Sequence, residues 1–259
     1  MALEDQNTAN LVWMVIAVLA GILHCIGIHF LLKLGKKKKV SHVLLIHLSG
    51  TEIAYLLFRG GFVIKRMVTL TVDGFKENSV DRAGSASILV GQYLSMFMIT
   101  GDRFLAVKLA LKYKAVVTGE KLFVLFPTCW VISVVSGCIT WYFPKVLTSL
   151  MIGWMATLTG TFVITYIYIF TASSSIRKKL NLWVPISIVV SFSCLYLFPA
   201  VLVEFGLVKY SPWLFVVFVV NILADSIIYV IGTKQVKDQL CCSSRNNSYN
   251  TTNSTNSTN

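Results

Sequence analysis

Charged residues are scarce in this sequence. They make up 13% of its 259 residues, against about 25% in soluble domains, while hydrophobic residues make up 56%. Acidic residues are the scarcer kind, 11 against 23 basic ones, and the basic residues occur in short clusters between apolar runs. This pattern excludes an ordinary soluble domain. It predicts a membrane protein whose lysines and arginines meet lipid headgroups, with no nucleic acid as partner.

Two further features are missing. Four of the six cysteines lie inside apolar runs and the other two, Cys241 and Cys242, follow the last run, so no extracellular disulfide framework is predicted. The first apolar run follows the acidic residues Glu4 and Asp5 and has neither a basic leader nor a small-residue cleavage site. We therefore expect an uncleaved first span and no removable signal peptide.

Long apolar runs are what the sequence has in abundance. A helix that crosses the hydrocarbon core needs about 20 apolar residues. Seven windows meet this need, at about 11–32, 41–63, 84–107, 122–143, 147–170, 182–205 and 212–232. They predict an all-α fold, a seven-transmembrane helix bundle over 11–232. It is preceded by a short extracellular segment, 1–10, and ends in an Asn/Ser/Thr-rich cytoplasmic tail, 243–259, which we expect to be disordered.

The basic residues also predict an orientation. With the N-terminus outside, the inner loops and tail hold 16 of the 23 basic residues. The positive-inside rule therefore favours an extracellular N-terminus and a cytoplasmic C-terminus.

The cytosolic end of the third window carries the most informative residues. It contains Asp102, Arg103 and Phe104, and Tyr113 follows nine residues after Phe104. An Asp-Arg pair alone is more typical of a helix end anchored at the membrane surface than of a receptor motif. The whole stretch to Tyr113 resembles the pattern Asp-Arg-Tyr-x-Ala-Ile-x-x-Pro-x-x-Tyr of rhodopsin-family (class A) G-protein-coupled receptors, with Phe104 for Tyr and Ala110 for Pro.

The resemblance implies a switch at this end of the bundle. An arginine here pairs with a neighbouring carboxylate or reaches toward water. Protonation of Asp102, or movement of a neighbouring helix, would release Arg103 to meet a heterotrimeric G protein. The family resemblance adds Phe104, Tyr113 and Tyr229 to the coupling region.

Other positions match the same family. Glu52 occupies the acid position of the second helix, and His24 the position where the family normally has Asn. Asn221 and Asp225 begin a pattern that resembles Asn/Asp-Pro-x-x-Tyr and ends at Tyr229. The resemblance implies that His24, Glu52, Asn221 and Asp225 form an intramembrane polar network, since charge in lipid should face the bundle interior.

The sixth and last segments add a hinge and an anchor. Pro199 stands in a stretch that resembles Cys-Trp-x-Pro, which implies a helix hinge. Residues 233–242 resemble the short amphipathic eighth helix. Cys241 and Cys242 stand where many members carry palmitate, and either acylated or free cysteines fit this position.

The ligand side departs from the family. Ser85 stands at the aminergic Asp position and Val219 at the retinal Lys position, so neither a biogenic amine nor a retinal cofactor is expected, and no other cofactor is predicted. The ligand is left as an unknown small molecule, lipid or peptide. The chain more faintly resembles the melanocortin, lysophospholipid and cannabinoid branch. The family further implies the plasma membrane as location and arrestin as a partner of the Ser/Thr-rich tail.

Other functions remain open at this stage. A seven-span transporter or channel would need a continuous polar path, and a signalling-impaired receptor-like protein would explain the altered motifs. An enzyme is not expected, and no metal site is predicted. His24 and His29 are five residues apart, as are His42 and His47, so neither pair shares one helix face.

Overall fold

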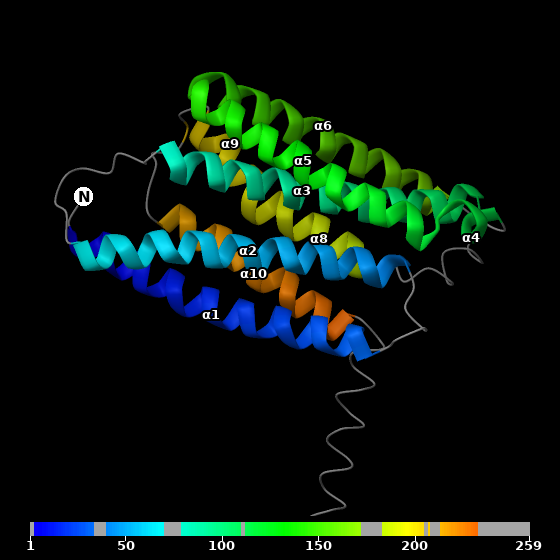
Figure 1. Ribbon diagram of the computed structural model, residues 1–259, viewed down its shortest axis with the longest axis horizontal. Coiled ribbons are helices and arrows are strands. Elements are labelled where there is room, and N and C mark those ends of the chain that lie inside the picture. The colour runs from blue at the N-terminus through cyan, green and yellow to red at the C-terminus, as the bar shows by residue number, and fades with distance from the viewer. Residues whose placement is uncertain are drawn as a thin grey trace, which may run out of the picture.

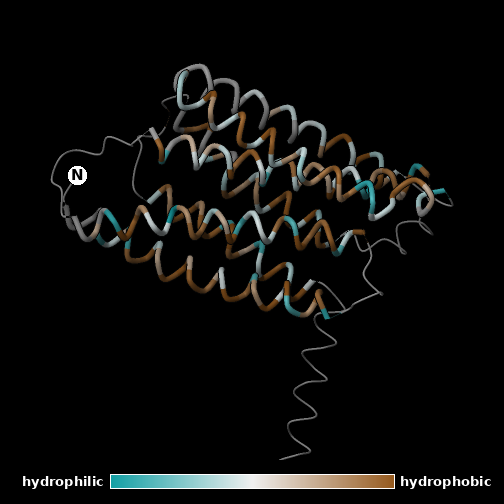
Figure 2. Tube along the Cα trace, in the orientation of Figure 1, coloured by the Kyte–Doolittle hydropathy of each residue, from teal (hydrophilic) through white to brown (hydrophobic). Residues whose placement is uncertain are grey.

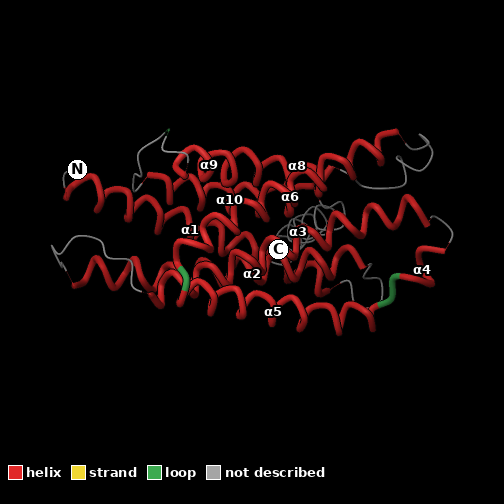
Figure 3. The backbone as a smooth tube through the Cα atoms, turned by 90° about the horizontal axis from the view of Figure 1, so that it is seen from above, coloured by secondary structure: helices red, strands yellow, loops and turns green. Residues whose placement is uncertain are grey.

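The computed structural model describes residues 3–33, 40–69, 79–109, 112–171, 183–204, 207 and 213–232. Nearly all of these residues are helical and none of them lies in a strand, which confirms the predicted all-α class. The helices run side by side along one direction (Figure 1), and the view from above shows them stacked in the same elongated bundle (Figure 3).

The long helices follow the apolar windows. They are α1 (Leu3–Lys33), α2 (Val40–Thr69), α3 (Ser79–Leu109), α5 (Gly119–Tyr142), α6 (Pro144–Thr171) and α10 (Trp213–Gly232). The sixth predicted window, 182–205, is covered by α8 (Trp183–Phe192), a π-helical turn η3 (Ser193–Leu197) and α9 (Phe198–Glu204). The short α4 (Tyr113–Val116) lies between α3 and α5. Apolar residues cover most of the length of the long helices (Figure 2).

Five of these helices are long and apolar enough to cross a membrane. The candidate spans are Asn7–Lys33, Val40–Lys65, Ala83–Leu109, Gly119–Tyr142 and Trp213–Gly232. Two shorter apolar stretches, Thr159–Thr171 and Trp183–Tyr196, lie in α6 and in α8 with η3. A helix satisfies its own backbone hydrogen bonds, which a chain in lipid requires. The chain is therefore a membrane-embedded protein that crosses the bilayer several times.

Helix ends differ from the predicted windows. α1 begins at Leu3, within the segment expected to precede the first span, and α2 continues six residues beyond its window to Thr69. Hydropathy marks only the part of a helix that lies in lipid, so a helix can extend past it into water. Between α5 and α6 only Phe143 is non-helical, which agrees with the very short loop expected there.

Small residues bring α3 and α5 close together. A Cβ atom on Gly137 would overlap Ser87 Oγ, and one on Gly91 would lie 3.4 Å from Ser133 Oγ. Close approach through small residues is how helices associate in lipid, where the hydrophobic effect does not drive them together. The opposite face of α5 is exposed and apolar, as at Phe123, which is 80% exposed.

The buried core is divided in two by a polar layer. One cluster lies on the side that the sequence predicts to be extracellular, and we call it the outer cluster; it includes Trp13, Leu56 and Val219. The other, which we call the inner cluster, includes Leu44, Met96 and Phe162. On α1, α2 and α10 the residues His24, Glu52 and Asp225 come between the two clusters along the helix.

Candidate functional site

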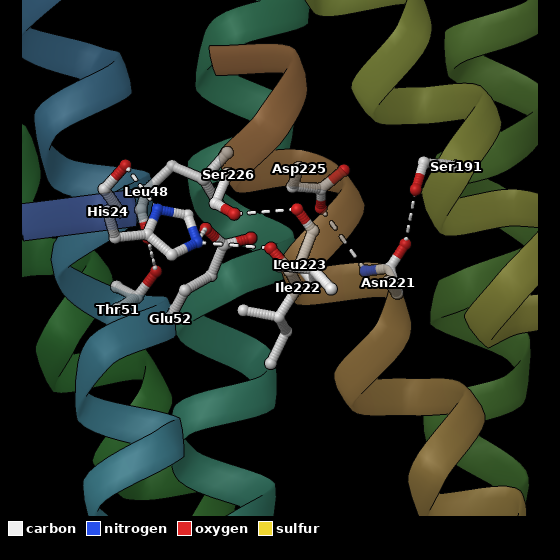
Figure 4. Close-up of polar contacts among 11 residues, drawn as sticks. His24, Leu48, Thr51, Glu52, Ser191, Asn221, Ile222, Leu223, Asp225 and Ser226 are labelled. Carbon is white, nitrogen blue, oxygen red and sulfur yellow. Dashed lines mark hydrogen bonds and ion pairs between the residues drawn. The ribbon is translucent and has the colours of Figure 1, made fainter. Parts of the chain in front are cut away.

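Four side chains predicted to form a polar network meet at this layer. His24 comes from α1, Glu52 from α2, and Asn221 and Asp225 from α10, and each is at most 4% exposed. Figure 4 shows their polar groups directed toward one another between the three helices. We call His24, Glu52 and Asp225 the central cluster. The structure thus brings together residues that lie up to 201 positions apart in the sequence.

The contacts of His24 indicate where its ring hydrogen lies. Nε2 is 3.1 Å from Glu52 Oε2 and 3.3 Å from the carbonyl oxygen of Ile222. Both neighbours can accept, so Nε2 carries a hydrogen, which it donates to the Ile222 carbonyl while lying beside Glu52 Oε2. Nδ1 lies 3.1 Å from Ser49 Oγ, a group that can either donate or accept. His24 therefore links α1 to both α2 and α10.

Asp225 is linked through Asn221 to Ser191 on α8. Ser191 Oγ on α8 donates to Asn221 Oδ1 at 2.9 Å, and Asn221 Nδ2 donates to Asp225 Oδ2 at 3.3 Å. The carboxyl groups of Asp225 and Glu52 are close enough to interact directly. Asp225 Oδ1 has no hydrogen-bond partner among the described residues. The network therefore extends from α1 through α2 and α10 to α8.

A small cavity adjoins Glu52 of the central cluster. It has about 10 Å³ of space for water centres, enough for roughly one water molecule. Helices α2, α3 and α10 line it together with α8 and η3, through Glu52, Tyr55, Leu89, Gln92, Met96, Phe192, Tyr196, Phe218, Asn221 and Ile222. A water molecule placed there would meet the carboxyl of Glu52 and the amide groups of Gln92 and Asn221.

The predicted switch residues form a second group, at the end of α3. Arg103 Nη2 lies 3.1 Å from Asp102 Oδ2, and the hydroxyl of Tyr113 donates to Asp102 Oδ1. The carboxyl of Asp102 is thus shared between its neighbour in sequence and the short helix α4. The side chain of Arg103 is 14% exposed, and its Nε has no hydrogen-bond partner within the described part of the chain. We call Asp102, Arg103 and Tyr113 the end triad.

Tyr113 lies outside the membrane-spanning segments, and its pKa is raised. Partial burial is the main cause, since it disfavours the phenolate, and the adjacent Asp102 carboxylate adds to it by hydrogen bonding and by repulsion. The Tyr113 hydroxyl therefore stays protonated and keeps its role as a donor to Asp102 throughout the physiological range.

Phe104 and Tyr229 lie in different places. The Phe104 ring packs 5.3 Å from the ring of Tyr168 on α6, with the Lys108 ammonium 5.6 Å from its centroid. Tyr229 is 2% exposed, and its ring packs against Gly27 of α1, where a Cβ atom would overlap it. Tyr229 therefore lies in the inner cluster, between α1 and α10.

The helix around Pro199 is irregular, as a hinge would require. Residues Ser193–Leu197 form a π-helical turn, and the N–H of Phe198 bonds to the carbonyl of Ser193. Proline has no N–H to donate, and wide turns of this kind commonly accompany such a break. Whether the helix moves here remains a prediction.

Several predicted residues lie elsewhere. Ser85 is half-buried on α3, and its Oγ has no hydrogen-bond partner in the described segments, while Val219 belongs to the outer cluster. Arg59 lies on the same face of α2 as Glu52 and is 3% exposed. Its guanidinium carbon lies 4.3 Å from the centroid of the Phe215 ring. Cys241, Cys242 and the proposed eighth helix, 233–242, lie outside the described residues, as does the tail.

Sequence reasoning missed a third polar site, at His47. Its Nδ1 lies 2.8 Å from Ser95 Oγ on α3, and its ring stacks on Phe126 of α5 at 4.2 Å. It also missed Ser49 and Ser191 in the network. Ser49 lies three residues before Glu52 and thus shares its face, which is a usable signal, whereas nothing in the sequence marks Ser191.

Within the described residues, no group of three or more His, Cys, Asp or Glu side chains is placed to hold a metal ion. No protein-family model matches the chain, and no curated protein matches it either.

Proposed function

We propose that the chain is a divergent seven-span receptor of the rhodopsin type that passes an extracellular signal to a heterotrimeric G protein. The observation that carries this proposal is the end triad, because Asp102, Arg103 and Tyr113 were singled out as parts of one motif and they meet around one carboxylate. In a switch of this kind, Asp102 holds Arg103 until a neighbouring helix moves or the carboxylate is neutralised.

The polar network supports the same proposal. It was expected from motif positions on three helices that are far apart in the sequence, and those helices are adjacent at these residues. In the proposed receptor α1, α2, α3, α5, α6, the α8–α9 segment and α10 are the seven spans. The N-terminus is extracellular, the C-terminus is cytoplasmic, and the location is the plasma membrane.

The proposed mechanism is a population shift between two arrangements of the bundle. A small-molecule, lipid or peptide ligand enters from the outer side. The helix that contains η3 and Pro199 bends, its cytosolic end moves outward, and Arg103 is released to the G protein. Arrestin would bind the Ser/Thr-rich tail, and palmitate on Cys241 and Cys242 would anchor the eighth helix.

Nucleotide exchange on a panel of purified G proteins tests the proposal. Wild type should stimulate exchange on at least one partner, and Arg103→Ala should abolish it. Lys108→Ala is the matched control, because Lys108 is an exposed base on the same helix, five residues after Arg103. This variant should retain most of the exchange.

Absence of exchange with every partner would contradict the proposal. Ion or solute flux through reconstituted wild type, lost in Glu52→Gln, would instead support a transporter or channel. A chain that shows neither exchange nor flux, but that folds and reaches the cell surface, would be a signalling-impaired receptor-like protein.

A further inference from the structure

We propose that His24, Glu52 and Asp225 form a proton-binding site in the middle of the membrane, so that protons are ligands of this chain. The inference does not depend on G-protein coupling. It rests on the burial of the central cluster, on its charge balance and on the geometry of its hydrogen bonds.

Charge balance is the first step. With both carboxyl groups ionised and the imidazole neutral, the central cluster would carry two negative charges in side chains that are 1% exposed. Isolated charge in such surroundings is strongly unfavourable. Arg59, on the same face of α2, is seven residues and about 10 Å further along the axis, with its guanidinium over Phe215. Two bound protons make the cluster neutral.

The geometry offers a place for each proton. His24 Nδ1 faces the Ser49 hydroxyl, which donates to a neutral imidazole and accepts from a protonated one. The imidazole is therefore satisfied as a neutral ring, with Nε2 donating and Nδ1 accepting. Glu52 Oε2 and Asp225 Oδ1 are buried oxygens without a hydrogen-bond partner among the described residues. These two carboxyl groups offer a place for each proton, because two adjacent carboxylates do not both stay ionised.

The other titratable groups that face the cluster are phenols. They are Tyr55 from α2, Tyr93 from α3, Tyr196 from η3 and Tyr229 from α10. Phenols remain neutral near pH 7 and so do not supply or remove charge there. The described part of α8 contributes Ser191, which has no charge. Protons that bind near neutral pH therefore bind to the carboxyl groups of Glu52 and Asp225, with the His24 imidazole beside them.

The sign of the pH effect follows from proton counts. In the unfolded chain at about pH 6 to 9, both carboxyl groups are ionised and histidine holds less than one proton. The folded chain holds two protons at these groups when the site is full, so folding binds protons. Stability then falls as pH rises through this range. Loss of the protons would make Glu52 and Asp225 repel each other and would loosen the junction of α2 with α10.

Thermal unfolding of the purified full-length protein in neutral-detergent micelles tests the site. The wild-type midpoint should fall from pH 6 to pH 9, and the slope should be reduced in Glu52→Gln and in Asp225→Asn, which cannot exchange a proton. Two controls should retain the wild-type slope. His29→Gln removes an exposed imidazole on the same helix as His24, and Glu120→Gln removes an exposed acid at the start of α5.

A measurement on wild type alone keeps the proposal falsifiable where a variant fails to fold. Infrared spectra near pH 7 should contain the C=O band of a protonated carboxylic acid, and the band should disappear as pH rises. A wild-type midpoint that does not vary with pH, or the absence of this band, would overturn the proposal. An equal slope in wild type and in both folded amide variants would overturn it as well.

Discussion

The central cluster and the end triad use similar chemistry in opposite ways. Each joins an acid to a base, with Glu52 beside His24 in one and Asp102 beside Arg103 in the other, and the closest distance is 3.1 Å in both. In the central cluster the partners come from different helices and are at most 2% exposed. In the end triad they are consecutive residues of α3, and Arg103 is 14% exposed.

This difference determines what each group can do. Breaking the pair between His24 and Glu52 leaves a buried polar group without its partner and removes a link between α1 and α2, so it should cost stability. Breaking the pair between Asp102 and Arg103 separates no helices, and Arg103 can be satisfied by water. The central cluster is suited to holding the bundle together, and the end triad to changing state at low cost.

The largest effect should come from removing the base of the central cluster. His24→Leu should lower the free energy of unfolding by about 3 kcal/mol, because Glu52 and the Ile222 carbonyl lose a buried polar partner. His29→Leu is the control, since His29 is an exposed histidine on the same helix. Denaturant titration of both proteins in micelles measures the difference, and equal losses would contradict the comparison.

Overfilling the contact between Gly27 of α1 and Tyr229 of α10 should have a smaller effect. Gly27→Ala places a methyl group into the ring of Tyr229 and should cost about 2 kcal/mol. Gly21→Ala, on the same helix, meets only Leu56 Cδ1 at 4.0 Å, so it should be neutral or slightly stabilising. If the same titrations show equal stability for the two variants, α1 and α10 do not pack at Tyr229 as described.

Removing the acid of the end triad should change stability less than the two changes above, but it should change activity strongly. Asp102→Asn should alter the free energy of unfolding by about 1 kcal/mol, because asparagine keeps an oxygen that can accept from Tyr113. In the proposed receptor it should raise basal nucleotide exchange, because Arg103 is no longer held by a carboxylate. Tyr113→Phe, which removes one hydrogen bond to Asp102, should show the same change to a smaller degree. Unchanged exchange in both variants would contradict the switch.

The smallest effect concerns ionisation of Tyr113. Its raised pKa means that the folded chain keeps this phenolic proton above about pH 10, where an unfolded chain would lose it. The stability contributed by the protonated hydroxyl is complete below that pH and is lost as pH rises further. Other tyrosines of the chain are buried, so ultraviolet titration should show one fewer late phenolate in Tyr113→Phe than in wild type. Loss of a phenolate that ionises near pH 10 would instead place Tyr113 in water, away from Asp102.

Much of the helical arrangement was predictable because it depends on local hydropathy. Each of the seven predicted windows falls mainly within helix, and five of the helices qualify as candidate spans by length and apolarity. The group of His24, Glu52, Asn221 and Asp225 was also predictable, from motif positions. Buried charge must face other protein in a membrane, which strongly restricts where such residues can lie.

The rest depends on how helices rotate against one another, which one sequence does not specify. The stacking of His47 on Phe126 requires α2 and α5 to present particular faces, and nothing in either helix alone indicates the pair. The same holds for Ser191 beside Asn221. Arg59 lies seven residues after Glu52 on the same helix face, so the sequence allows it to join the polar network or to reach outer water, and the structure places it over Phe215.

The π-helical turn at Ser193–Leu197 changes the direction in which the side chains after it point around the helix axis. An α-helix turns by about 100° per residue, so the wide turn, which accommodates one extra residue, offsets α9 from α8 by about that angle. Tyr196 within the turn lines the cavity, while Phe198 just after it is 61% exposed. Deleting one residue from this turn would restore regular α-helical winding and rotate α9 about its axis, so that α9 presents a different set of side chains to the interior.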